Sequence, residues 1–302
     1  MSGIKYHAPL PIVGLGLGVS SVVYAVEGLG VEVLLNKLPN SSANSLTITN
    51  KEAAQHTEEV SLLNNLVNRF TEISVQECKL EIKTNILFKY LSFFYLFPSI
   101  ITGVAVACND ACGKPFERRE LFNFLRSSLD YNGDNVFWNK IACCLIGGLV
   151  LGNNGESISS YRRITIPYGF CSIGLFSINS SKEIGTNLNN TEKTVVDALN
   201  LCFCLDRSDF TGFDEISLNS ISKASILDDV EQLFMDIVVD KGGGYFLRPS
   251  SLSKRALVVM AKNDFVGTEV LAEFDKKTKE SSLASSYKTL ILKHNLEGVY
   301  RL

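Results

Sequence analysis

Apolar and polar positions follow two different periods along the chain, which predicts a mixture of helices and strands. Between residues 51 and 70 the apolar side chains recur at helical spacing and include Leu63, Val67 and Phe70, whereas residues 80–86 alternate as in a half-buried strand. By the same criteria we predict further helices at 117–129, 134–144, 191–204 and 227–239, and further strands at 149–152, 164–178, 256–261 and 287–293. The mixed order shows no internal repeat and favours an α+β fold with two layers.

A polar segment near residues 155–165 separates this pattern into two halves. It contains the run GESISSYRR, which interrupts the apolar residues on either side. We therefore predict an N-terminal domain at 1–160 and a C-terminal domain at 161–302.

Two uncharged stretches, residues 8–26 and 90–108, have about the length that spans a bilayer. The first contains Pro9, Pro11 and several glycines, so we interpret it as a strand, a loop and then a helix. Within residues 22–36 we expect this helix to end and a strand to follow. The second has Pro98 in its middle and fits either a buried strand-to-helix passage or a kinked membrane span. We favour the buried passage. An integral membrane protein and an exposed aromatic patch that binds a partner are the alternatives.

Composition and charge narrow the class of protein. A chain of 302 residues with 46% hydrophobic residues can bury a full core, and its net charge of −3 leads us to expect no nucleic-acid partner. Cysteines inside apolar runs, such as Cys143-Cys144, fit a reducing compartment, and no cleavable signal is evident, so we expect a cytoplasmic protein. The three histidines (His7, His56 and His294) are too dispersed in the sequence to predict a metal site.

A glycine-rich segment, from Gly14 to Ser21, is the first candidate for chemistry. An extended start followed by glycines and a helix is the layout that directs backbone N–H groups at a phosphate. The segment lacks the spacing of a Walker A loop and the third glycine of a dinucleotide-binding fingerprint, so a tight turn is the competing interpretation.

The pair Asp134-Asn135 at a predicted helix start is the second candidate, and helix capping is its simplest structural role. The run from Asn132 to Val136 leads into that helix and then into Gly147-Gly148 and a strand. Together with Ala8-Pro9 and the glycines that follow, Asn109–Phe116, and Asn295–Val299 as a closing strand, this order of motifs resembles the GHMP kinase superfamily and, within it, homoserine kinase.

This resemblance implies a two-layer GHMP-kinase-like fold, with a ribosomal protein S5 domain 2-like N-terminal half and a ferredoxin-like C-terminal half. It implies ATP-dependent phosphorylation of the hydroxyl of homoserine, in threonine biosynthesis, with ATP and Mg²⁺ as cofactors, an amino acid as substrate and a homodimer as one option. The residues that it places in the site are catalytic Asp134 and Asn135 and substrate-binding Gly16, Gly18, Ser20, Ser181, Lys182 and Lys223.

Departures from the family pattern concern the ATP site. Where the family has its glycine-rich phosphate loop, this chain has large side chains, namely Leu91, Phe93, Phe94, Tyr95 and Phe97. We expect Phe93, Phe94 and Phe97 to fill that space. A phosphate cannot reach backbone N–H groups past such side chains. The family's metal-binding glutamate has no counterpart, so no metal ligand is predicted. These departures predict weakened or lost catalysis, and the alternative is a non-catalytic protein of the same fold that binds a metabolite or a protein.

Overall fold

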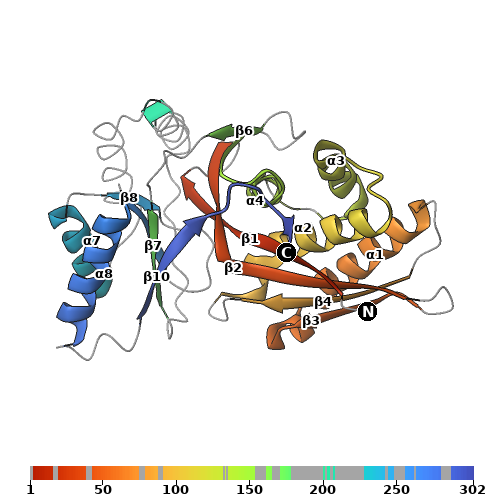
Figure 1. Ribbon diagram of the computed structural model, residues 1–302, viewed down its shortest axis with the longest axis horizontal. Helices are drawn as coiled ribbons and strands as arrows, with labels where there is room; N and C mark the ends of the chain where they lie inside the picture. The colour runs from red at the N-terminus through yellow and green to blue at the C-terminus, as the bar shows by residue number, and fades with distance from the viewer. Residues whose placement is uncertain are drawn as a thin grey trace.

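The computed structural model describes residues 3–15, 20–38, 43–74, 79–87, 91–131, 133, 135–153, 161–164, 171–177, 200, 203, 204, 207, 228–241, 244–247, 256–261, 263–279 and 287–302. These residues form an α+β fold (Figure 1), which confirms the fold class predicted from the sequence.

The N-terminal half is a sheet built around one long central strand. Its strands are β1 (Ile4–Leu15), β2 (Ser20–Leu38), β3 (Ser45–Thr49), β4 (Lys79–Ile86), β5 (Leu149–Asn153) and β6 (Tyr161–Ile164). β2 pairs antiparallel with β1 between Val22 and Leu35, with β4 along its second half and with β5 along its first half. β3 extends the sheet parallel to β4, and β6 extends it beyond β5, so residues at the predicted seam continue the N-terminal sheet.

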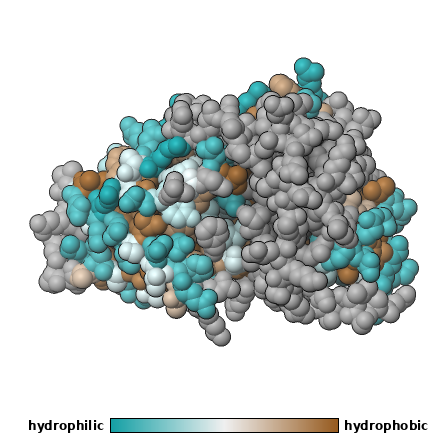
Figure 2. All heavy atoms as spheres, turned by 180° about the vertical axis from the view of Figure 1, so that it is seen from behind, coloured by the Kyte–Doolittle hydropathy of each residue, from teal (hydrophilic) through white to brown (hydrophobic). Residues whose placement is uncertain are grey.

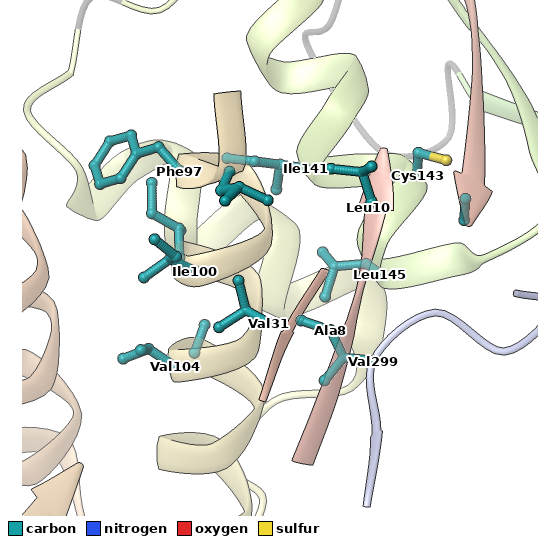
Figure 3. Close-up of a cluster of buried hydrophobic side chains, with 14 of the residues drawn as sticks. Ala8, Leu10, Val31, Phe97, Ile100, Val104, Ile141, Cys143, Leu145 and Val299 are labelled. Atoms are coloured by element: carbon teal, nitrogen blue, oxygen red, sulfur yellow. The ribbon is translucent and has the colours of Figure 1, made fainter. Parts of the chain in front are cut away.

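Helices cover one face of this sheet (Figure 1). They are the 3-10 helix η1 (Lys51–Gln55) and the helices α1 (Thr57–Ile73), α2 (Phe93–Ala111), α3 (Arg118–Ser128) and α4 (Asn135–Ile146). The periodicity of α1 predicts its buried face correctly, because Leu63, Leu66, Val67 and Phe70 are all buried. Side chains of α2 and α4 meet those of β1 and β2 in one apolar core, where Ile100, Ile141 and Val31 lie together (Figure 3).

The C-terminal half is an antiparallel sheet with two helices on one face (Figure 1). Its strands are β7 (Cys171–Ser177), β8 (Gly244–Leu247), β9 (Ala256–Ala261) and β10 (Tyr287–His294), in the order β10-β7-β9-β8, and its helices are α7 (Asp229–Asp240) and α8 (Asp264–Lys279). These helices and strands enclose a second apolar core around Phe234 and Phe274. The two cores accord with two halves, and the boundary between residues 160 and 161 stays a prediction.

The end of the chain returns to the N-terminal sheet. Two residues of β10 pair with β2, and β11 (Tyr300–Arg301) pairs with β1. Residues Asn295–Val299 between them form a turn, so the prediction of a closing strand there is wrong. α8 has no counterpart among the predicted elements, and the helix predicted at 191–204 lies mostly outside the described residues.

The prediction of a helix within residues 22–36 is also wrong, because this segment belongs to β2. Residues 22–26 are buried on both faces of the sheet, and a strand buried on both faces has a continuous apolar run that periodicity cannot distinguish from a helix. The glycines at 28 and 30 mark an irregular pairing with β1 instead of a helix end. A Cβ atom on Gly30 would lie 2.0 Å from the carbonyl oxygen of Ala8, so only glycine fits this close approach.

Residues 93–111 form one helix, α2, where we predict a strand-to-helix passage. Pro98 lies inside the helix, and the hydroxyl of Thr102 donates a 2.6 Å hydrogen bond to its carbonyl oxygen. α2 packs against β1, β2, α1 and α4, which explains why it is apolar on nearly every side. The predicted burial of this apolar segment is therefore confirmed, whereas its predicted division into a strand and a helix is not confirmed.

No helix in the described part of the chain is both long and apolar enough to cross a membrane. The large apolar side chains that do reach the surface are dispersed over several elements, namely Ile73, Phe203, Val239, Phe265, Ile291, Leu296 and Leu302. Figure 2 shows apolar residues as small areas between polar ones on the described part of one face. Phe93, Tyr95 and Phe97 at the start of α2 are buried, so these three do not belong to the exposed patch considered as an alternative.

Candidate functional site

The start of α2 occupies the position where the resemblance places a phosphate loop. Ser92 caps the helix: its hydroxyl accepts a 3.4 Å hydrogen bond from the N–H of Tyr95, and its carbonyl oxygen accepts a 3.3 Å bond from the N–H of Leu96. The cap thereby binds one N–H of the first turn that would otherwise lack a partner, that of Tyr95, and the bond from Leu96 is the first regular bond of the helix. Leu91, just before the cap, is buried.

Buried aromatic side chains occupy the described positions of the first two turns of α2. Phe93 and Phe97 are fully buried and Tyr95 is 1% exposed, which confirms the predicted burial of Phe93 and Phe97. The side chain of Phe94 lies outside the described residues. A phosphate would have to displace these rings before it could reach the backbone of the first turn.

An aromatic cluster fills the space between the starts of α2 and α4. It consists of His56, Phe93, Phe97, Tyr131, Phe137 and Trp138. The ring of His56 stacks on Phe93 at 4.9 Å, and the ring of Phe97 lies 5.8 Å from Tyr131 and 6.2 Å from Phe137. These centroid distances are those of rings in direct contact. The aromatic cluster therefore joins the two helix starts by direct packing of rings.

A buried lysine lies beside this cluster. Lys140 of α4 is 7% exposed, and its ammonium lies 4.5 Å from the centroid of the Tyr95 ring. The face of an aromatic ring attracts a cation, which offsets part of the cost of burying this charge near the positive end of α2. Our sequence interpretation misses Lys140, although a single cation within the apolar run of α4 is a visible signal.

Asn135 is the one predicted catalytic residue that the structure describes. It is the first residue of α4 and is half-buried, so the prediction of a helix start at Asp134-Asn135 is confirmed to within one residue. Phe137, two residues later, connects this helix start to Phe97 of α2. Asp134, Ser181, Lys182 and Lys223 lie outside the described residues, so their roles stay predictions.

The glycine-rich segment does not lead into a helix. β1 ends at Leu15 and β2 begins at Ser20, and these two strands pair antiparallel. A strand follows the glycine-rich segment, so there is no helix start at this place whose N–H groups could point at a phosphate. The phosphate-binding interpretation of this segment is wrong in that respect. Gly16 and Gly18 lie outside the described residues, and of Ser20 only the backbone, paired with Asn153 of β5, is described.

Two motifs of the resemblance meet at the other end of α4. The N–H of Gly148 donates a 2.6 Å hydrogen bond to the carbonyl oxygen of Asn295, and the N–H of Val299 donates to the carbonyl oxygen of Cys144 at 2.8 Å. Gly298 has a φ of +75°, and a Cβ atom there would lie 2.4 Å from the carbonyl oxygen of Leu145. The turn at 295–299 is thus seated on the last carbonyl groups of α4.

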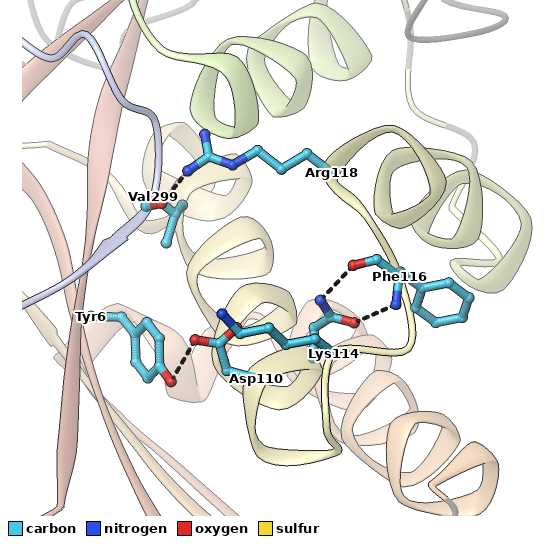
Figure 4. Close-up of polar contacts among 7 residues, drawn as sticks. Tyr6, Asp110, Lys114, Phe116, Arg118 and Val299 are labelled. Atoms are coloured by element: carbon cyan, nitrogen blue, oxygen red, sulfur yellow. Dashed lines mark hydrogen bonds and ion pairs between the residues drawn. The ribbon is translucent and has the colours of Figure 1, made fainter.

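Arg118 of α3 also binds the turn at 295–299 and the C-terminal end of α4 (Figure 4). Its guanidinium donates hydrogen bonds to the carbonyl oxygens of Leu145 at 2.6 Å, of Val299 at 3.3 Å and of Glu297. A cation at the C-terminal end of a helix also interacts favourably with the helix dipole. This motif pair therefore stabilises the fold and lies away from the start of α4.

The motif at 109–116 is structural as well. The side chain of Asn109 donates to the carbonyl oxygen of Phe116 at 2.8 Å and accepts from its N–H at 3.1 Å, which closes the turn after α2 (Figure 4). Beside it, the hydroxyl of Tyr6 donates to Asp110 at 3.1 Å, and Lys114 forms an ion pair with the same carboxylate. Burial, followed by the charge of Asp110, raises the pKa of the Tyr6 phenol, which therefore stays a donor.

The three histidines each contact an aromatic ring. His56 joins the aromatic cluster, and the ring of His294 lies 5.3 Å from that of Tyr24. Within the described ranges no three His, Cys, Asp or Glu side chains converge as a metal site would require. His7 is 4% exposed, and its Nε2 accepts a 3.5 Å hydrogen bond from the N–H of Gly28, which requires a neutral ring.

The stability of the protein is expected to fall on acidification because of His7. Burial lowers its pKa below 6.5, although Glu27 and Glu32 oppose the shift. The unfolded chain therefore takes up this proton first, so the stabilisation is complete above about pH 6.5 and is lost as the pH falls through the pKa of the folded state. Denaturant unfolding at pH 7.5 and 5.5 measures the loss. His7→Gln should reduce it, whereas an unchanged loss in this variant would refute this role.

The described cysteines are free thiols, several of them buried. Burial raises the pKa of Cys144 to about 12, with opposing contributions from Ser99, Thr102 and Lys140, and also raises that of Cys143. Both thiols are therefore neutral and unreactive core groups, as the sequence predicts.

No family model and no curated protein match this sequence. Solved structures do resemble the fold. A homoserine kinase from Cytophaga hutchinsonii matches with a TM-score of 0.73 and 15% identity, over 100% of this chain and 98% of its own. Mevalonate diphosphate decarboxylases from Enterococcus faecalis and Staphylococcus aureus match with TM-scores of 0.66 and 0.65 and identities of 14% and 12%, over 100% of this chain and 99% and 98% of theirs.

The chain has the GHMP kinase fold. Within this GHMP kinase fold, the motifs at 109–116, 147–148 and 295–299 hold turns and helix ends together. The start of α2, by contrast, is filled by the aromatic cluster and capped by Ser92. The residues present there do not fit the phosphates of ATP, because buried rings take the place of the family's glycines and Ser92 already binds the N–H of Tyr95.

Proposed function

We propose that this chain is a homoserine-kinase-like protein in which ATP-dependent phosphorylation of a small-molecule hydroxyl is weakened or lost. The observation that carries the proposal is the burial of Phe93, Tyr95 and Phe97 in the first two turns of α2. Phosphoryl transfer depends on positioning the phosphates and neutralising their charge. A helix start covered by aromatic rings offers neither.

If the protein retains activity, the proposal includes ATP and Mg²⁺ as cofactors and an amino acid as substrate. A decarboxylase structure of the same fold is a complex with AMPPCP and magnesium, which supports this cofactor pair for an active protein. In this chain Asn135 is the described member of the expected site, and its place at the start of α4 suits a side chain that contacts a substrate. The expected cytoplasmic location and homodimer remain part of the proposal.

The alternative is a non-catalytic protein of the same fold that binds a metabolite or another protein. The aromatic cluster favours it over an active kinase, because packed rings stabilise the fold whether or not a nucleotide binds. A non-catalytic protein predicts no ATP turnover at all, whereas the main proposal also allows a weak residual rate.

An assay that couples ADP release to NADH oxidation, with Mg-ATP and homoserine, tests the proposal. We expect a turnover rate at least about a thousandfold below that of an ordinary kinase, because the charge-neutralising contacts are missing. Asn135→Ala serves as the matched variant, because the proposal expects any rate that belongs to this chain to depend on that side chain. Homoserine-dependent turnover at an ordinary kinase rate that Asn135→Ala abolishes would contradict the proposal.

A further inference from the structure

Two buried hydrogen-bond donors on the outer side of α4 have no partner. One is Nη1 of Arg126 in α3, and the other is the hydroxyl of Tyr161 at the start of β6. Tyr161 is 9% exposed, whereas Arg126 as a whole is half-buried, so part of its guanidinium lies near the surface. A buried donor without an acceptor costs free energy, which makes two such groups in one region a feature that needs an explanation.

The packing around α3 and α4 brings these donors together. Phe122 lies one helical turn before Arg126, and its ring is 5.4 Å from that of Tyr161 and 6.1 Å from that of Trp138. The guanidinium of Arg126 lies over the same Trp138 ring, at 5.5 Å from the centroid. Tyr161 therefore lies beside one ring, and Arg126 beside the other, of the Phe122–Trp138 pair, and the charge of Arg126 acts on the Tyr161 phenol.

Gly152 of β5 gives Tyr161 the space for this position. The two residues are paired across β5 and β6, and a Cβ atom on Gly152 would lie 2.7 Å from the Tyr161 ring. The same atom would lie 2.5 Å from the side chain of Asn139. Any larger residue at 152 would displace the tyrosine ring or the asparagine.

The protonation and charge of the two groups favour an anion as the missing acceptor. Burial raises the pKa of the Tyr161 phenol, and the charge of Arg126 opposes this only in part, so the phenol stays protonated and can donate. No described carboxylate forms an ion pair with Arg126. A neutral water would accept a hydrogen bond and leave the guanidinium charge uncompensated, whereas an oxyanion satisfies both donors and the charge.

We propose that Arg126 and Tyr161 form a binding site for a small oxyanion, a carboxylate or a phosphate, between α3, α4 and β6. The site involves neither the start of α2 nor Asn135, and the residue that it shares with the aromatic cluster is Trp138. Trp138 is the only tryptophan of the chain and lies against the Arg126 guanidinium, so it reports on the site directly.

Titration of the full chain with inorganic phosphate or with acetate, followed by tryptophan fluorescence at constant ionic strength, tests the site. We expect a saturable change with at least one anion and none with chloride, and the anion that saturates distinguishes phosphate from carboxylate chemistry. Tyr161→Phe, which removes only the hydroxyl, should weaken binding about tenfold and keep or raise the unfolding temperature, since it deletes an unpartnered buried donor.

Arg126→Gln should abolish the response, and Arg119→Gln on the exposed side of the same helix should leave it unchanged. If Arg126→Gln does not fold, the comparison of the native chain with Tyr161→Phe decides the question. No saturable response to either anion, or equal affinity in Tyr161→Phe, would overturn the proposal.

Discussion

Truncating Phe97 to Ala should lower the free energy of unfolding by about 3–5 kcal/mol without creating a nucleotide site. Phe97 is fully buried and its ring contacts those of Phe93, Tyr131 and Phe137. The variant loses both the burial of a whole ring and its aromatic contacts, and it leaves a cavity that the surrounding rings fill only in part. The N–H groups that Ser92 caps stay bonded, so no phosphate contact is gained.

Denaturant unfolding of the native chain and the variant measures this loss. Phe265→Ala on α8 is the matched control, because the same truncation is made at a side chain that is 69% exposed. We expect the control to change the free energy of unfolding by less than about 1 kcal/mol. Equal, small effects of the two truncations would mean that the start of α2 is not packed as described.

Replacing Gly298 with Ala should lower the free energy of unfolding by about 3 kcal/mol or more. Part of this cost, about 1–2 kcal/mol, comes from the positive φ of 75°, which an L side chain disfavours. The rest comes from the Cβ atom, which would lie 2.4 Å from the carbonyl oxygen of Leu145 and would push the turn at 295–299 off the end of α4. That displacement would also weaken the hydrogen bonds from Arg118 to Leu145 and Val299.

Gly113→Ala separates the two contributions. Gly113 has a φ of +88°, yet a Cβ atom there would meet no atom within 4 Å. The variant should therefore show only the conformational cost of about 1–2 kcal/mol in the same unfolding experiment. If Gly298→Ala costs no more than Gly113→Ala, the close contact between the C-terminal turn and α4 is not formed.

The elements that can be predicted are those with one polar and one apolar face. α1 and α3 show helical spacing over several turns, and β4 alternates strictly, so their buried faces follow from the sequence. α4 can be predicted from its flanking residues, the Asp134-Asn135 start and the Gly147-Gly148 end. The order of these elements and motifs is enough to indicate the GHMP kinase fold.

β2 and α2 cannot be predicted correctly because each is buried on nearly all sides. A central strand and a core helix both have continuous apolar runs, and Pro98 suggests an interruption where the helix continues. The turn at 295–299 is easily confused with a strand because its β-branched Val299 and its length suit either form. Its conformation depends on carbonyl groups of α4 that are more than a hundred residues away.

The sequence predicts that the candidate site lacks a glycine-rich phosphate loop. The aromatic residues at 91–97 can be recognised as unsuitable for a phosphate from their size alone, and Phe93 and Phe97 are buried accordingly. Their partners cannot be foreseen, because His56, Tyr131 and Phe137 come from segments that only the fold brings together. The same is true of Arg126 and Tyr161, which belong to no motif in the sequence and become a pair only around Phe122 and Trp138.

Hydrogen exchange at the first turn of α2, measured with and without Mg-ATP, tests the central claim most directly. Because the N–H groups of Tyr95 and Leu96 are bonded to Ser92 within a packed helix start, we predict slow exchange that Mg-ATP does not change. Fast exchange at these two amides in the free protein, with protection when Mg-ATP is added, would show that this helix start is an open phosphate site and would contradict the account.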